Sequence, residues 1–211
     1  MSNIEELRDS TTPALPARDT GHQTCPRPSG RPLAILDFEA SCLVNRGMRS
    51  FPIEVAVGFP ESGEVRSWLI RPEPEWLEAW TWDPEAERLH GLSRDYLLAN
   101  GRPRSEVAQE LAAALNGHEP LSDNPAYEQY WLWGLFGQYP GFRIGSLGEL
   151  FQQIAGGGLA GQAMLELASA HAREKAPLRH RATADVKHYL VMLRELRRLA
   201  GEDRMDSNPS G

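Results

Sequence analysis

The sequence lacks the features of membrane, secreted and disulfide-stabilised proteins. It has no run of about eighteen apolar residues, so no segment is long enough to span a bilayer. The N-terminus carries Glu5, Glu6 and Asp9 without an apolar segment, which argues against a secretory signal. Two cysteines, Cys25 and Cys42, are too few for a disulfide framework or a four-ligand zinc site. These absences predict a protein of the reducing cytoplasm that does not bind membranes.

An excess of positive charge is also absent. The chain has 22 Lys and Arg against 29 Asp and Glu, a net charge of −7. This balance argues against a protein that coats nucleic acid through charge alone. It is compatible with an enzyme that holds nucleic acid through bound metal ions, because the ions supply the positive charge.

Length and composition predict one domain between two tails. The chain has 211 residues, of which 41% are hydrophobic, enough for a substantial core. Residues 1–31 combine prolines with Ser, Thr, Gly and Asp and show no apolar period, and residues 201–211 are polar. We therefore expect disordered tails at 1–31 and 201–211 and a folded domain over 32–200.

Apolar periodicity within this domain predicts a mixed α/β sheet. Strands come first along the chain and alternate with helices afterwards, which is typical of this fold class. Ser146 is placed to cap the helix that follows it. The predicted strands are 33–40, 53–59, 64–70 and a short one at 142–144, and the main predicted helices are 103–115, 125–136, 159–172 and 181–200.

The end of the first strand carries two carboxylates, Asp37 and Glu39. Residues two apart on a strand point to the same face with Cα atoms about 6.6 Å apart. This spacing suits metal ions about 3.5–4 Å apart, as in two-metal phosphodiester hydrolysis. The alternative is that both acids only solvate the strand end. Phe38, between them, points to the opposite face and is expected to pack there.

Two further segments place acidic groups near helix starts. His180 precedes the last helix and Asp185 lies one turn inside it, where Asp185 either binds a metal or complements the helix dipole and pairs with Arg181. Ahead of the helix at 125–136, Asp123 is expected to be its N-cap. Glu128, in the first turns of that helix, faces either a metal or solvent.

Together these segments resemble the DEDDh exonucleases, a 3′–5′ exonuclease family with the ribonuclease H-like fold. The first family motif, Asp-x-Glu, is matched by Asp37-Phe38-Glu39-Ala40-Ser41, and the last, His-x4-Asp, by His180 to Asp185. Ile53-Glu54-Val55-Ala56 and the segment 87–93 add to the likeness. The resemblance implies a mixed five-stranded sheet flanked by helices.

The middle motif departs from the family. Where the family usually has His-Asn-Ala-x-Phe-Asp, this chain has Asp123-Asn124-Pro125-Ala126-Tyr127-Glu128. A glutamate keeps the charge but moves the carboxylate out by one methylene, and Mg²⁺ demands near-ideal octahedral geometry. Either Glu128 or Asp123 would then complete the metal site.

The resemblance implies a hydrolase that shortens single-stranded RNA or DNA from the 3′ end to nucleoside 5′-monophosphates. His180 would accept the proton of the attacking water, and the backbones of Phe38 and Ala40 would contact the terminal nucleotide. Two Mg²⁺ or Mn²⁺ ions would be held by Asp37, Glu39, Asp185 and Glu128, with Asp123 as the alternative ligand.

Other interpretations of the same residues stay open. The altered middle motif is also compatible with a binding module that has lost catalysis, and the acidic balance with a phosphodiesterase for short oligonucleotides. Three tryptophans, Trp76, Trp80 and Trp82, occupy a loop-like segment and are candidates for stacking on bases. No pattern decides between RNA and DNA, and none predicts or excludes a homodimer.

Overall fold

The computed structural model describes residues 30–44 and 48–201. The predicted tails fall almost entirely on residues outside these ranges, so the tails stay a prediction. In chain order the elements are β1 Leu33–Ala40, β2 Pro52–Gly58, β3 Val65–Leu69, α1 Pro74–Ala79, α2 Pro84–His90, α3 Arg94–Asn100, α4 Arg104–Leu115, β4 Glu119–Ser122, α5 Pro125–Phe136, β5 Gly145–Ser146, α6 Leu147–Ala155, α7 Gly158–Lys175 and α8 Ala182–Ala200.

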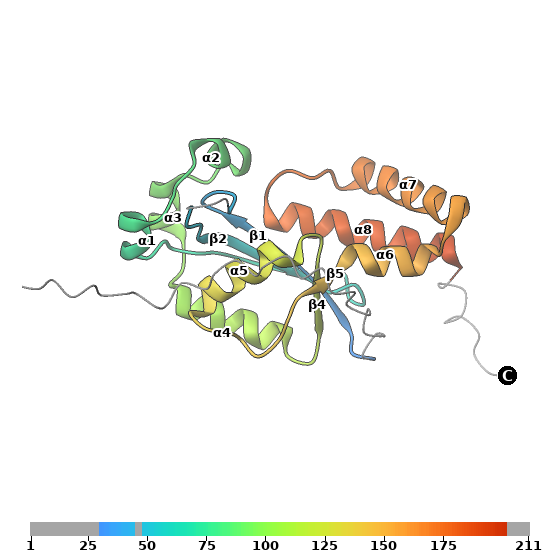
Figure 1. Cartoon of the computed structure of the whole chain (residues 1–211), viewed down its shortest axis with the longest axis horizontal. Helices are drawn as coiled ribbons and strands as arrows, with labels where there is room; N and C mark the ends of the chain where they lie inside the picture. The colour runs from blue at the N-terminus through green and yellow to red at the C-terminus, as the bar shows by residue number, and fades with distance from the viewer. Residues whose placement is uncertain (1–29, 45–47, 202–211) are drawn as a thin grey trace, which may run out of the picture.

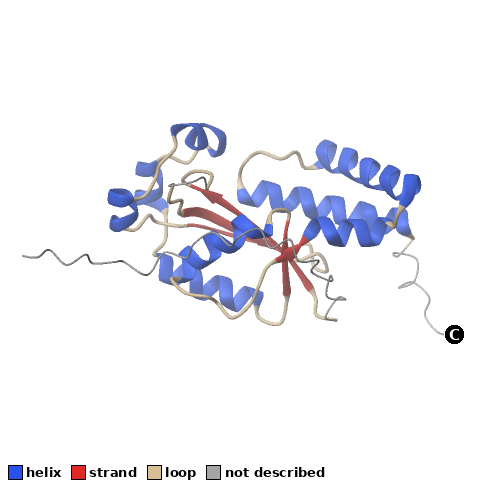
Figure 2. Ribbon diagram, viewed as in Figure 1, coloured by secondary structure: helices blue, strands red, loops and turns tan. Residues whose placement is uncertain are grey.

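One five-stranded sheet forms the centre of the molecule, with helices on both faces (Figures 1 and 2). Its order is β3-β2-β1-β4-β5; β1 pairs antiparallel with β2, and β2 with β3. On the other side, β1 pairs parallel with β4, and β4 with β5. The predicted mixed five-stranded sheet flanked by helices is confirmed.

The alternation of side chains along β1 separates two hydrophobic cores. Leu36 and Phe38 point into a core that includes residues of α4 and α5, whereas Leu33 and Ile35 point into a core with residues of α6, α7 and α8. Both faces of β1 are covered, which explains its continuous apolar run. Asp37 and Glu39 share the parity of Ile35, so these acids lie on the α8 face at the end where β1 leaves its core.

Helix α8 packs closely against β2 because Gly58 has no side chain. A Cβ added at Gly58 would lie 2.5 Å from Cγ1 of Val186 and 2.8 Å from Cδ1 of Leu190. We expect Gly58→Ala to destabilise the protein by about 1–3 kcal/mol through overpacking and to lower Tm by several degrees. Thermal unfolding checks this, with Gly157→Ala as the control because a Cβ there meets no atom within 4 Å. An unchanged Tm for Gly58→Ala would contradict this packing.

The short strand predicted at 142–144 is wrong. The pairing with β4 falls at Gly145 and Ser146, opposite Leu121 and Ser122. A Cβ at Gly145 would lie 2.7 Å from Cδ2 of Leu121, so glycine permits the close approach of the two strands. Ser146 caps α6 as predicted, because its hydroxyl accepts a hydrogen bond from the backbone N–H of Glu149.

The segment expected to be loop-like, with tryptophans free to stack on bases, is partly helical. Trp76 lies in α1, is buried and stacks on Phe51 with ring centroids 5.3 Å apart. Trp80 and Trp82 are half-buried beside the same Phe51. Trp76 therefore belongs to the core and does not offer a face to a nucleic-acid base.

Candidate active site

Five carboxylates meet where β1 ends, beside the starts of α5 and α8. They form two groups that share Asp37, and within each group one carboxylate oxygen per residue lies within 4.8 Å of the others. The first group is Asp37, Glu39 and Asp185, and the second is Asp37, Asp123 and Glu128. The structure thus brings together all the acidic residues that the sequence singled out, including the alternative ligand Asp123.

The strand geometry of the first motif is as predicted. Asp37 and Glu39 share a face and both approach Asp185 of α8. Phe38 is 4% exposed and packs in the core on the opposite face. Asp37 is itself buried at 9% exposure, so it does not merely solvate the strand end. The roles proposed for the backbones of Phe38 and Ala40 stay predictions.

The prediction that Asp123 caps α5 is wrong. The N-cap of α5 is Asn124, and it makes no side-chain capping hydrogen bond. The Asp123 carboxylate instead accepts a hydrogen bond of 2.7 Å from the hydroxyl of Tyr189 in α8. This contact keeps Asp123 beside Asp37 and leaves it part of the acidic cluster.

Glu128 faces the cluster and not solvent. It is 3% exposed, and its Oε2 is buried without a hydrogen-bond partner among the described residues. A buried carboxylate oxygen without a partner carries a large desolvation cost, which a cation would offset. The residues grouped with Glu128, Asp37 and Asp123, also offer carboxylate oxygens, the ligands that Mg²⁺ and Mn²⁺ prefer. The residues present therefore fit a divalent cation.

The start of α8 also differs from the simplest expectation. Asp185 does not pair with Arg181; Oδ1 of Asp185 accepts the backbone N–H of Arg179 at 2.8 Å, and Arg181 binds Glu54. His180 lies just before the helix, as predicted, and is exposed. Its φ of 51° is left-handed, a conformation that residues other than glycine rarely adopt. Contacts on both sides of His180 hold this turn.

The crowded carboxylates shift one another's protonation. Burial, followed by the charges of neighbouring acids, raises the pKa of Asp37 and of Glu128 well above the ordinary range. Burial, with the charges of Asp185 and Glu54, raises the pKa of Glu39 to about 8, against the opposing effect of Arg181. Such shifts are typical of functional sites, because negative charge is concentrated where water cannot screen it.

These raised pKa values predict that the metal-free protein loses stability as pH rises from about 6.5 to 8. Unfolded carboxyls are already ionised in this window, whereas the folded state still holds protons, so folding becomes less favourable with pH. Below this window His90, whose pKa burial lowers to about 4, acts in the opposite direction. We expect Tm in EDTA to fall by about 5 °C or more across the window, and Mg²⁺ or Mn²⁺ to abolish most of the fall. A Tm in EDTA that is flat or rises would contradict the shifts.

Two residues of the site region were missed by the sequence analysis. Tyr189 follows Asp185 by four residues and so shares its face of α8, which is the sequence signal that could have identified it. Glu54 was noted only as part of a resemblance. The signal for Glu54 was an acid inside an apolar strand, where acidic residues are depleted.

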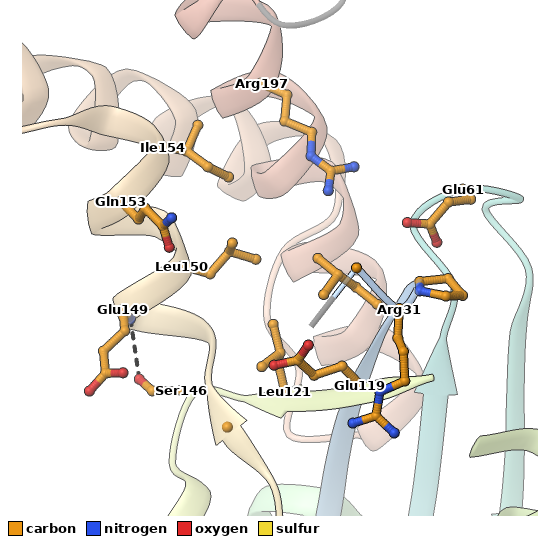
Figure 3. Close-up of a pocket in the computed structure, with 14 residues that line it drawn as sticks. Arg31, Glu61, Glu119, Leu121, Ser146, Glu149, Leu150, Gln153, Ile154 and Arg197 are labelled. Carbon is orange, nitrogen blue, oxygen red and sulfur yellow. Dashed lines mark hydrogen bonds between the residues drawn. The ribbon is translucent and has the colours of Figure 1, made fainter. Parts of the chain in front are cut away.

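A separate cavity of about 700 Å³ lies away from the carboxylates (Figure 3). It is lined by the start of β1, the start of β4, α6 and the end of α8, and Figure 3 shows Arg31, Glu119 and Arg197 around it. None of the predicted site residues lines it. The candidate active site is therefore the carboxylate cluster at the opposite end of β1.

Solved structures similar to this chain include several exonucleases. Exonuclease I matches with a TM-score of 0.59 at 16% identity, over 84% of this chain and 44% of that one. Exonuclease I of E. coli in complex with a dT13 oligonucleotide gives 0.58 at 14% identity, over 83% and 43%. A 3′-exonuclease in a study of recognition of the 3′ end of a histone mRNA stem-loop gives 0.54 at 15%, over 83% and 82%. No protein-family model matches the sequence, and no curated protein is similar to it.

The chain has the fold of the DEDDh-type 3′–5′ exonucleases. This ribonuclease H-like fold is shown by structure and not by sequence, since the identities are near 15%. The chain spans less than half the length of the exonuclease I structures that it matches, and about four-fifths of the 3′-exonuclease. Among the described residues, no helix combines the length and hydropathy that a bilayer-crossing segment needs.

Proposed function

We propose that this chain is a metal-dependent 3′–5′ exonuclease that hydrolyses single-stranded RNA or DNA to nucleoside 5′-monophosphates. The observation that carries the proposal is the pair of carboxylate groups that share Asp37. Two ions held about 3.5–4 Å apart by a common carboxylate are the arrangement that phosphodiester hydrolysis uses. The exonuclease fold supports the same assignment.

The position of each residue suggests its role, either in metal binding or in proton transfer. Asp37, Glu39 and Asp185 would hold one Mg²⁺ or Mn²⁺ ion, and Asp37, Asp123 and Glu128 the other. When bound, such ions lower the pKa of a water and stabilise the oxygen that leaves. A ring nitrogen of His180 accepts a proton from the water that attacks the phosphorus of the terminal nucleotide. The bond from that phosphorus to the 3′ oxygen of the preceding nucleotide breaks, and this oxygen takes up a proton from solvent to become a 3′-hydroxyl. His180 is exposed, so its ring is accessible to that water.

The structure also supports a role for both Asp123 and Glu128, which the sequence left as alternatives. Glu128 reaches the cluster from inside α5, and Asp123 reaches it from the residue before the α5 N-cap. A three-carboxylate group offers a cation more oxygen ligands than a pair does. We therefore include Asp123 as a ligand, oriented by the Tyr189 hydroxyl.

Degradation of 5′-labelled single-stranded RNA and DNA, each with Mg²⁺ or Mn²⁺, tests the proposal. We expect a ladder that shortens from the 3′ end, releases nucleoside 5′-monophosphates and disappears in EDTA. Tight oligonucleotide binding without hydrolysis would support the binding module instead, and hydrolysis confined to short oligomers the phosphodiesterase. For an inert wild type, Glu128→Asp restores the residue usual in the family and is the variant to assay next. The cytoplasmic setting stays a prediction from the cysteine content.

A further inference from the structure

Glu54, in the middle of β2, is a buried acid for which the proposed chemistry has no direct use. It is 3% exposed and pairs in register with Glu39 of β1. A buried carboxylate beside another acid is costly unless cations or N–H groups neutralise it. The residues that bind Glu54 come from the start of α8, 127 and 128 positions along the chain.

Glu54 fixes the first turn of α8 through three hydrogen bonds. Nε and Nη2 of Arg181 donate to its two carboxylate oxygens at 2.9 and 3.0 Å, a bidentate ion pair. The backbone N–H of Ala182 donates to Oε2 at 3.1 Å. The N-cap residue, Arg181, makes no capping hydrogen bond with its own side chain, so Glu54 supplies a cap from the sheet.

His180 lies between these hydrogen bonds to Glu54, which we call the clamp, and a second contact made by Asp185. On its N-terminal side the Arg179 N–H binds Asp185, and on its C-terminal side Arg181 and Ala182 bind Glu54. Between them His180 takes a left-handed φ of 51°, which is unfavourable for a histidine unless its surroundings impose it. Because Asp185 accepts its own hydrogen bond from the Arg179 N–H, we expect loss of Glu54 to free the His180 turn while this contact of Asp185 remains.

We propose that Glu54 is a positioning residue that holds His180 in its working orientation through Arg181 and the Ala182 N–H. The inference rests on the proposed function, because it assumes that His180 receives the proton. A purely structural Glu54 would stabilise the fold without acting through His180. The two roles differ in what happens when His180 is absent.

The test is a double-mutant cycle with Glu54→Gln and His180→Ala. Glu54→Gln keeps the side-chain shape and removes the charge, and we expect kcat to fall about 10- to 100-fold with KM unchanged when Mn²⁺ is saturating. In the His180→Ala background, Glu54→Gln should cost nothing further. If the double variant instead loses kcat by the product of the two single-variant decreases, the proposal is overturned. Glu54→Asp, which retains the charge, should recover part of kcat.

Glu195→Gln is the matched control, because Glu195 forms a bidentate ion pair with Arg198 in the same helix but far from His180 along the chain. It should leave kcat unchanged. Should Glu54→Gln fail to fold, Arg181→Lys breaks the bidentate contact from the other partner and takes its place in the cycle.

Hydrogen exchange separates failure of this inference from failure of the proposed function. Glu54→Gln should speed amide exchange in residues 179–185, whereas Glu195→Gln should not, whether or not the wild type is active. An inert wild type with faster exchange in Glu54→Gln contradicts the exonuclease and leaves the clamp supported. Unchanged exchange overturns the clamp.

Discussion

Replacement of Asp37 by asparagine lowers the rate of 3′-end hydrolysis by about 1,000-fold or more, equivalent to about 4 kcal/mol of transition-state stabilisation. Asp37 is the residue that both carboxylate groups share, so the substitution weakens both metal sites at once. Initial rates at high Mn²⁺ and calorimetric Mn²⁺ titration measure the two effects. We expect the titration to lose the high-affinity binding of the wild type.

The control is a carboxylate outside the cluster. Glu61 is exposed and lines the separate cavity, so Glu61→Gln should keep the wild-type rate and metal affinity. Wild-type hydrolysis by Asp37→Asn would contradict the shared-ligand site. Loss of hydrolysis with unchanged metal binding would show that Asp37 acts in some other way.

Asp37 could be predicted from sequence because its placement follows from local geometry. The apolar run before it marks a buried strand, and a period of two puts Glu39 on the same face. The same local rules gave α5 and the position of His180 ahead of α8. In each case the determining residues lie within a few positions of one another.

Contacts across the fold were the ones that sequence reasoning missed. Local rules assigned Asp123 to capping, whereas its partner Tyr189 is 66 residues away. They also paired Arg181 with Asp185 four positions on, although the sheet offers Arg181 a better partner in Glu54, 127 residues earlier. A buried bidentate partner outcompetes an exposed helical pair, which contributes only about 0.2–0.5 kcal/mol.

Replacement of His180 by alanine lowers kcat by about 10²- to 10⁴-fold, the usual contribution of a general base. The reason is positional: His180 is exposed and lies two residues before Ala182, the first residue of α8, in the turn that leads to Asp185. His180 belongs to neither carboxylate group. Metal affinity measured by calorimetry should therefore stay within a few-fold of wild type, which distinguishes this variant from Asp37→Asn.

The loss in His180→Ala should also depend on pH in a way that identifies the missing base. Hydroxide competes better for the proton as pH rises, so the deficit relative to wild type should shrink at alkaline pH, and added imidazole should recover part of the rate. His171→Ala, in α7, serves as the control and should match wild type throughout. A His180→Ala enzyme with wild-type kcat would remove the proposed base. A variant that loses metal affinity to the same degree as activity would instead place His180 among the groups that hold the ions.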